Sequence, residues 1–190
     1  MMEGAVILWI PHKWQIAKSE HPWKPKYSKR KAPWEVDDDY CLSVVAKQPY
    51  NKGPRFLDLM DAAVFDFLIG NADRHHIEHL AHNNDTGMML LLDNGKSFGN
   101  PHKDETSILA PLYQCCKLRH STYTRLKSFS TESSNSSSLS RLLDKRLEKD
   151  PLHPLLTEDH LSAIDRRLKR ILITMGLCFD REGRENVLMS

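Results

Sequence analysis

The chain has 190 residues, of which 40% are hydrophobic and 27% are charged. This length suits one domain and is short for two. The 27 basic and 25 acidic residues give a formal net charge of +2, with ten His counted as neutral. The composition excludes an intrinsically disordered chain, and the balanced charge argues against a nucleic-acid binder that relies on bulk positive charge.

The apolar runs are short: Met88–Leu92 is typical, and a membrane helix needs about 18 residues. The chain as given is therefore expected to be soluble. Its first eleven residues include an apolar run but lack the basic start, long apolar centre and cleavage site of a signal peptide. We expect no signal segment here.

The first third of the chain mixes irregular and helical patterns. Residues 12–36 are rich in basic residues, Pro and Trp, which predicts an irregular surface segment held by Trp anchors. Three acidic residues then precede Tyr40–Val45, a pattern typical of a helix start. Phe56–Ile69 carries apolar residues at three- and four-residue steps, so we predict a buried helix that ends near Gly70.

The second half is predicted to be mostly helical. Met88–Leu92 ends in Asp-Asn-Gly and favours a short strand that runs into a tight turn. Helices are expected over 107–116, 122–129 and 159–177. The serine run at 130–140 predicts a flexible surface loop within the same lobe. The fold class is therefore mainly α with one small β element.

Four cysteines offer a disulfide framework. Cys115 and Cys116 are adjacent, so their α-carbons lie about 3.8 Å apart, below the usual disulfide range of about 4.4 to 6.8 Å. Two connectivities remain: Cys41–Cys115 with Cys116–Cys178, or Cys41–Cys116 with Cys115–Cys178. Either one joins the centre of the chain to both flanks, and four buried reduced thiols are the alternative.

Two acceptor sequons make Asn84 and Asn135 candidates for N-glycosylation. They lie in the two most polar predicted loops. Together with paired cysteines they favour a lumenal or secreted protein.

The candidates for chemistry lie between the strongest helix and the apolar strand. Asp73 follows the helix, and Asp93 ends the strand twenty residues later. This arrangement matches a kinase catalytic lobe, in which a loop Asp deprotonates the acceptor hydroxyl and a second Asp holds the metal on ATP. Five residues after Asp73, where kinases place a metal-ligating Asn, stands Glu78, which we predict as a second metal ligand.

Two other interpretations compete with the kinase hypothesis. Gly-Asn-x-Asp and Asp-Asn-Gly are also common turn sequences. His75 and His76 offer zinc ligands, together with His79 or His82, although no CxxC or HExxH spacing supports a zinc site.

Three segments carry a family resemblance: DAAVFDFLIGNADRHH at 61–76, LDNGKSFGNP at 92–101 and SILAPLYQCC at 107–116. They resemble the Golgi secretory-pathway kinases, a family that contains glycosaminoglycan xylosylkinases and the Golgi casein kinase of secreted proteins. Weaker similarity extends from about Gly4 to Cys178. The resemblance therefore covers almost the whole chain, and it is nearest to the xylosylkinases.

The resemblance implies that residues 1–190 form the C-terminal catalytic lobe of an atypical, protein-kinase-like secretory kinase. Asp73 matches the catalytic Asp, and Asp93 matches the metal-binding Asp of an Asp-Asn-Gly motif. The implied bridges are Cys41–Cys115 and Cys116–Cys178. Four neighbours are expected near the nucleotide or substrate: Arg74, His75, His76 and Asn94.

The activity implied by the resemblance is transfer of phosphate from ATP, with Mn²⁺ or Mg²⁺, to the 2-hydroxyl of xylose in the proteoglycan linkage region. The alternatives are a secreted-protein Ser/Thr kinase of the Golgi casein kinase type and a catalytically inactive interaction module. The expected partner is a glycan acceptor or a secreted protein, with a possible dimer with a family member and no nucleic acid. The expected location is the Golgi lumen.

Three features depart from the family pattern. The serine run at 130–140 replaces a more ordinary helical connection. Ile77 stands where the family usually has Tyr after the paired histidines. No glycine-rich phosphate loop, N-lobe Lys or paired Glu is found in the sequence. We therefore expect a C-terminal lobe without its N-lobe, which by itself is inactive because it cannot clamp ATP normally.

Overall fold

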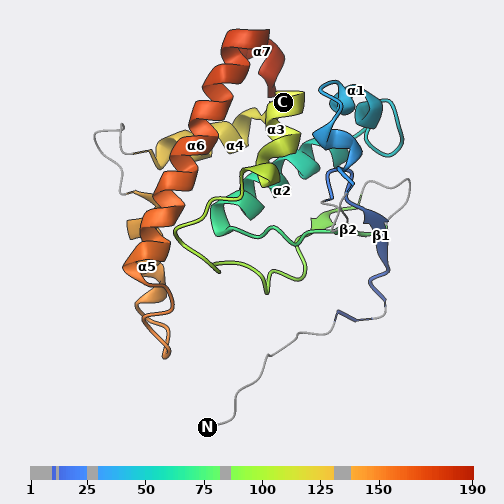
Figure 1. Ribbon diagram of the computed structural model, residues 1–190. Helices are drawn as coiled ribbons and strands as arrows, with labels where there is room; N and C mark the ends of the chain where they lie inside the picture. The colour runs from blue at the N-terminus through green and yellow to red at the C-terminus, as the bar shows by residue number, and fades with distance from the viewer. Residues whose placement is uncertain (1–9, 12, 25–29, 82–86, 131–137) are drawn as a thin grey trace.

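A computed structural model describes residues 10–11, 13–24, 30–81, 87–130 and 138–190 (Figure 1). Both predicted sequons, at Asn84 and Asn135, and most of the predicted serine-rich loop lie outside these residues. Within the described residues, no helix combines the length and apolar character that crossing a membrane requires.

The core is built around helix α2, Arg55–Ile69. Its apolar residues at three- and four-residue steps, Leu59, Met60, Ala63 and Phe67 among them, are buried. Helix α3, Ala110–Cys115, and the long helix α6, Glu158–Glu182, pack against it (Figure 1). The predicted helix at 56–69 is confirmed, and so is its end at Gly70.

The other helices cover this core. The predicted helices at 40–45, 107–116, 122–129 and 159–177 are confirmed, although the second begins as a 3-10 turn and α6 continues to Glu182. The remaining helical bounds are α1 Tyr40–Val45, α4 His120–Ser128, α5 Leu139–Leu147, α7 Arg184–Val187 and two 3-10 turns at Pro33–Glu35 and Thr106–Leu109.

Helix α5 corrects the predicted loop over 130–140. Ser138 is the N-cap residue of α5, and its hydroxyl accepts a 3.4 Å hydrogen bond from the Arg141 backbone N–H. Leu139 and Ser140 lie inside the helix. Ser140 also donates its hydroxyl to Asp165 of α6 at 2.6 Å, so the end of the serine run joins two helices.

The strand predicted within Met88–Leu92 is confirmed, but it is one of five short strands in two small sheets among the described residues. Strand β1, Ile16–Glu20, pairs antiparallel with β2, His76–Leu80, which also pairs with β3, Met89–Leu90. In a second sheet, β4, Leu118–Arg119, lies parallel to β5, Leu188–Met189. The prediction of an irregular segment over 12–36 is therefore wrong at β1 and at the 3-10 turn. The polar strands β1 and β2 lack the apolar alternation that sequence analysis detects.

Buried tryptophans hold the N-terminal segment to the core, as predicted. Trp23 and Trp34 are both buried. The Trp23 indole N–H donates to Gln114 Oε1 at 2.6 Å, and Gln114 Nε2 donates to the Trp34 carbonyl at 2.9 Å. One α3 side chain therefore fixes both anchors.

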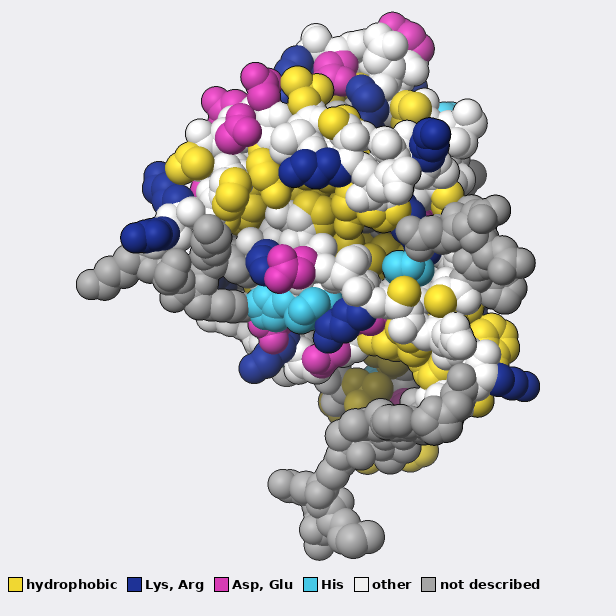
Figure 2. Space-filling model, turned by 90° about the vertical axis from the view of Figure 1, so that its right-hand side faces the viewer, with side chains coloured by type: hydrophobic (Ala, Val, Ile, Leu, Met, Phe, Trp, Pro, Cys, Tyr) yellow, Lys and Arg dark blue, Asp and Glu magenta, His cyan; other side chains and the backbone are white. Residues whose placement is uncertain are grey.

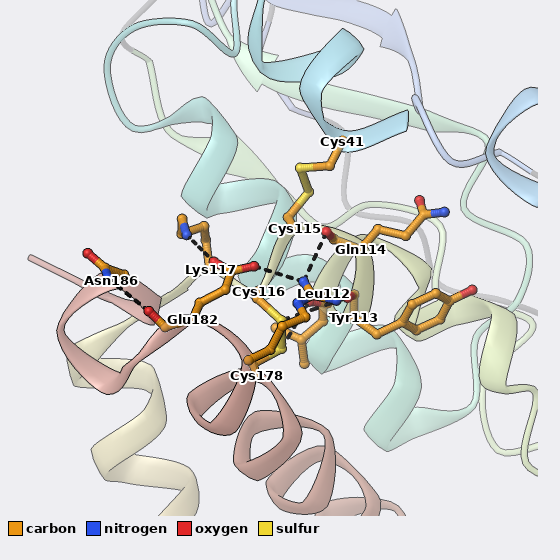
Figure 3. A network of polar contacts seen from close by, with 11 residues as sticks. Cys41, Leu112, Tyr113, Gln114, Cys115, Cys116, Lys117, Cys178, Glu182 and Asn186 are labelled. Carbon is orange, nitrogen blue, oxygen red and sulfur yellow. Dashed lines mark hydrogen bonds and ion pairs between the residues drawn. A yellow bond between two sulfur atoms is a disulfide. The ribbon is translucent and has the colours of Figure 1, made fainter. Parts of the chain in front are cut away.

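Two disulfides staple α3 to its neighbours (Figure 3). Cys41–Cys115 joins α3 to α1, and Cys116–Cys178 joins its end to α6. This pairing is the one that the family resemblance implies. Cys116 has a φ of 47°, and this left-handed turn lets two adjacent cysteines reach different helices. Beside the bridges, Lys117 pairs with Glu182 of α6 at 2.7 Å.

Candidate active site

The candidate catalytic loop, residues 70–75, begins where α2 ends. Gly70 takes the left-handed conformation, with φ 71°. A β-carbon at this position would lie 2.8 Å from Nη1 of Arg167, which donates to the Leu68 carbonyl. Glycine is required here both for the backbone turn and for the close approach of α6. The chain then crosses to β2 through Asn71, Ala72, Asp73, Arg74 and His75.

Arg74 forms a buried clamp under this loop. Its guanidinium group makes a bidentate ion pair with Asp66 of α2, and the Nη2–Oδ1 distance is 2.8 Å. The same group donates to the Leu92 carbonyl at 2.9 Å and to the Asn94 side-chain oxygen at 2.6 Å. Arg74 and Asp66 are both buried. The clamp therefore joins α2, the catalytic loop and the Asp-Asn-Gly segment.

The clamp brings the two candidate aspartates to one place. Asp73 immediately precedes Arg74, and Asp93 lies between Leu92 and Asn94, both of which Arg74 binds. Asp93 has a φ of 52° and is exposed, while Asn94 donates back to the Leu91 carbonyl at 2.9 Å. The two segments that carry Asp73 and Asp93 are therefore joined by one network, while both side chains stay accessible.

Asp73 has a histidine partner. Its carboxylate Oδ1 lies 2.6 Å from Nε2 of His75, and its backbone N–H donates to Asn71 Oδ1 at 3.1 Å. The Asp73 side chain is 39% exposed, so an acceptor hydroxyl can reach it. The His75 carbonyl accepts from the backbone of His21 at 2.9 Å, which fixes the loop from the β1 side.

Buried polar groups behind the loop are strongly perturbed. Burial, opposed by Arg74 and Asn71, raises the pKa of Asp66 above its ordinary value. Burial next to Arg74 also lowers the pKa of His21 to about 3, so this imidazole is neutral at physiological pH. The neutral ring accepts a hydrogen bond from the Trp23 backbone at 3.1 Å. These groups lie behind the loop and support it.

The other predicted site residues are placed differently. Arg74 points inward, so it acts on the site through its neighbours. His76 is exposed at the start of β2, and its ring lies 6.5 Å from that of His75. Glu78 lies within β2 and pairs with Lys18 of β1 at 3.7 Å. Figure 2 shows the β1 and β2 side of the molecule, where His side chains gather with acidic and basic ones.

No group of three or more His, Cys, Asp and Glu side chains is placed to hold a metal ion among the residues that the structure describes. A kinase metal needs fewer protein ligands, because Mg²⁺ is usually bound by one or two carboxylates plus the nucleotide phosphates. The exposed carboxylate of Asp93 fits that requirement. The zinc alternative has no ligand cluster in the described part of the chain.

A second arginine network supports the site from α6, and the sequence analysis did not identify its role. The carboxylate of Asp104 accepts from Arg166 at 2.7 Å and from Arg167 at 2.9 Å, and Arg170 lies at 3.2 Å. The pKa of Asp104 is lowered to about 2, and the largest cause is hydrogen bonding from Arg166. Arg167 also donates to the Lys103 carbonyl at 3.2 Å, so α6 holds the segment that follows Asp93.

The helical core, the loop after α2 and the Asp-Asn-Gly turn define a kinase-like C-terminal lobe. Residues 1–187 match the family described as "Golgi casein kinase, C-terminal, Fam20". The chain belongs to this Fam20 family.

Similar proteins agree with this assignment. The human glycosaminoglycan xylosylkinase is 47% identical over 190 residues, which is 100% of this chain and 45% of that protein. A structure of hydra Fam20 with sugar has a TM-score of 0.90 and 56% identity, over 96% of this chain and 51% of the other. A crystal structure of the Golgi casein kinase with Mn/ADP bound has a TM-score of 0.88 and 37% identity, over 96% and 44%. The chain thus spans about half the length of its relatives or less.

Proposed function

We propose that this chain supplies the catalytic lobe of an ATP-dependent kinase that phosphorylates the 2-hydroxyl of xylose in the proteoglycan linkage region. The observation that carries the proposal is the Arg74 clamp, which holds Asp73 and Asp93 in one network. The 47% identity to human glycosaminoglycan xylosylkinase favours xylose as the acceptor. Two disulfides suit a secretory-pathway protein, and we propose the Golgi lumen as its location.

Each aspartate has a separate role in this proposal. The Asp73 carboxylate accepts the proton of the sugar hydroxyl as that oxygen attacks the γ-phosphorus of ATP and the bond to the β-phosphate breaks, releasing ADP. His75, 2.6 Å from Asp73, orients the carboxylate. Asp93 is the protein ligand for Mn²⁺ or Mg²⁺, which when bound neutralises phosphate charge. The structure of the Golgi casein kinase with Mn/ADP bound supports a metal ion that is bound together with the nucleotide.

Glu78 remains a weaker candidate for the second metal ligand. Its carboxylate already pairs with Lys18 across the sheet. We propose that it balances charge in β2 and that Asp93 alone supplies the essential protein oxygen. Glu78→Gln would then leave Mn²⁺-dependent ADP binding within twofold of the parent, whereas Asp93→Asn would abolish it.

The test uses a chimera, because the chain matches less than half of the xylosylkinase. These 190 residues replace the matching segment of the human enzyme, and phosphate transfer from Mn-ATP is measured on a xylose-containing linkage tetrasaccharide and on a Ser-x-Glu peptide. Asp73→Asn should lower kcat at least a thousandfold, while the exposed control Asp180→Asn should retain it. A folded chimera that phosphorylates neither acceptor would refute the kinase proposal.

A secreted-protein Ser/Thr kinase is the second candidate function. It is favoured by the likeness to the Golgi casein kinase, at a TM-score of 0.88. Preference of the chimera for the Ser-x-Glu peptide would reverse the order of the two candidates. Both candidates share the roles of Asp73 and Asp93, so the acceptor comparison separates them cleanly. The predicted dimer with a family member stays a proposal, which sedimentation of the chimera tests.

A further inference from the structure

A groove between α4 and α6 has a volume of about 620 Å³. That volume is in the range of ligand-binding sites. Its lining combines apolar and polar side chains, and two of the polar ones are lysines. The lining side chains include Tyr123, Lys127, Phe129, Asp165, Lys169 and Ile173.

The groove presents positive charge. Lys127 and Lys169 are exposed and have no ion-pair partner among the described residues. Two other charged side chains line the groove: Arg166 pairs with Asp104 at 2.7 Å, and the carboxylate of Asp165 accepts a hydrogen bond from the Ser140 hydroxyl at 2.6 Å. This surface favours an anionic partner.

Exposed aliphatic side chains continue the groove along α6. Ile173 is 53% exposed and Leu177 is 65% exposed. Lys169, Ile173 and Leu177 are four residues apart, so they form one row on the helix about 12 Å long. Large exposed aliphatic side chains beside a cavity are typical of a surface that binds another protein.

Gly176 lies within this face. It is a helix-interior glycine without a positive φ, and a β-carbon placed on it would meet no atom within 4 Å. Nothing in the described chain therefore requires glycine here, although glycine costs about 1 kcal/mol relative to alanine inside a helix. A partner backbone that approaches α6 closely would require it.

We propose that the α4–α6 groove binds an acidic amphipathic segment of a partner protein. Apolar side chains of the segment pack in the groove and cover Ile173 and Leu177. Its carboxylates pair with Lys127 and Lys169. A glycan is a poorer occupant, because the exposed side chains of Ile173 and Leu177 offer no replacement for the water that sugar hydroxyls would lose. This proposal does not depend on the kinase activity.

The experiment measures binding of a fluorescein-labelled helical peptide to the oxidised 190-residue chain by anisotropy. The peptide carries Leu at positions i, i+3, i+4 and i+7 and Glu elsewhere, and a control peptide replaces each Glu by Lys. We expect the Glu peptide to bind at least tenfold more tightly than the Lys peptide. Lys127→Glu with Lys169→Glu should weaken it at least tenfold.

Gly176→Ala separates binding from folding. It should raise the melting temperature of the free chain and weaken peptide binding at least fivefold. The exposed control Arg141→Ala on α5 should leave peptide affinity unchanged. Equal binding of both peptides, or unchanged affinity in the lysine and glycine variants, would overturn the proposal. Tighter binding of heparin than of the Glu peptide would assign the groove to a glycan, and self-association of the chain through this groove would assign it to a second copy.

Discussion

Replacing Arg74 by Met tests the clamp beneath the candidate site. The substitution removes the bidentate partner of Asp66 and the donors to Leu92 and Asn94. Asp66 is only 3% exposed, so its carboxylate would be left inside the protein with Asn71 as its remaining described side-chain donor. Breaking a buried ion pair in this way costs about 3–5 kcal/mol. That is a large part of the stability of a typical domain.

Urea unfolding of the oxidised chain at pH 7 measures this cost, with Arg141→Met as a control for loss of an exposed arginine, expected at under about 0.5 kcal/mol. The double variant Arg74→Met with Asp66→Leu should recover much of the loss, because neither buried charge remains. A cost below about 1 kcal/mol for Arg74→Met, or a double variant that loses the sum of both single changes, would refute the clamp.

The pH dependence of Arg74→Met gives an independent check. Burial raises the pKa of Asp66 and Arg74 opposes that rise, so removing Arg74 should raise the folded-state pKa further. A carboxyl group whose pKa is higher in the folded than in the unfolded state destabilises the fold once pH rises through the folded pKa. The cost of the substitution should therefore shrink as pH is lowered from 7 toward about 4. A cost independent of pH would indicate lost packing alone.

Three further predictions concern other supports of the fold. The pKa of Asp104 is lowered to about 2, so its carboxylate should stabilise the fold above about pH 4, and this stability should be lost as pH falls toward 2. In acid titrations of unfolding, Asp104→Asn should remove about 1–2 kcal/mol of this pH-dependent stability, a figure reduced for the solvent around the arginines. Replacing Cys116 and Cys178 by Ser should cost about 4 kcal/mol in urea unfolding, because the bridge closes a loop with a sequence separation of 62. Gln114→Leu should cost about 1–3 kcal/mol and alter Trp23 fluorescence, since the indole N–H loses its acceptor; unchanged fluorescence and stability would contradict that contact.

The helical part of the fold could be predicted because its apolar periodicity is strong. Phe67 and Leu59 belong to a regular apolar pattern on α2, and Gly70 marks its end. Strands β1 and β2 escaped prediction because β1 buries no side chain fully and β2 includes His79 at an inward position. Their pairing depends on contacts between segments about 60 residues apart, which local patterns do not encode.

The candidate site was also predicted only in part. Asp73 and Asp93 could be proposed as candidates, because loop and strand-end aspartates at this spacing suit phosphoryl transfer. The role of Asp66 could not be predicted, because a carboxylate in the apolar second half of α2 does not reveal its partner. Asp66 lies between Phe65 and Phe67 in the sequence, which indicates burial, and a buried acid needs a cation or a proton. Arg74, eight residues later across the turn, satisfies that need.

The two disulfides divide the covalent chain into consecutive rings, one from Cys41 to Cys115 and one from Cys116 to Cys178, which meet at a single peptide bond. A protease cut inside either ring leaves the two pieces joined by sulfur. Only a cut between residues 115 and 116 would separate the halves. A lobe built this way can tolerate a nick in a surface loop of either ring and keep both pieces attached until it meets a reductant.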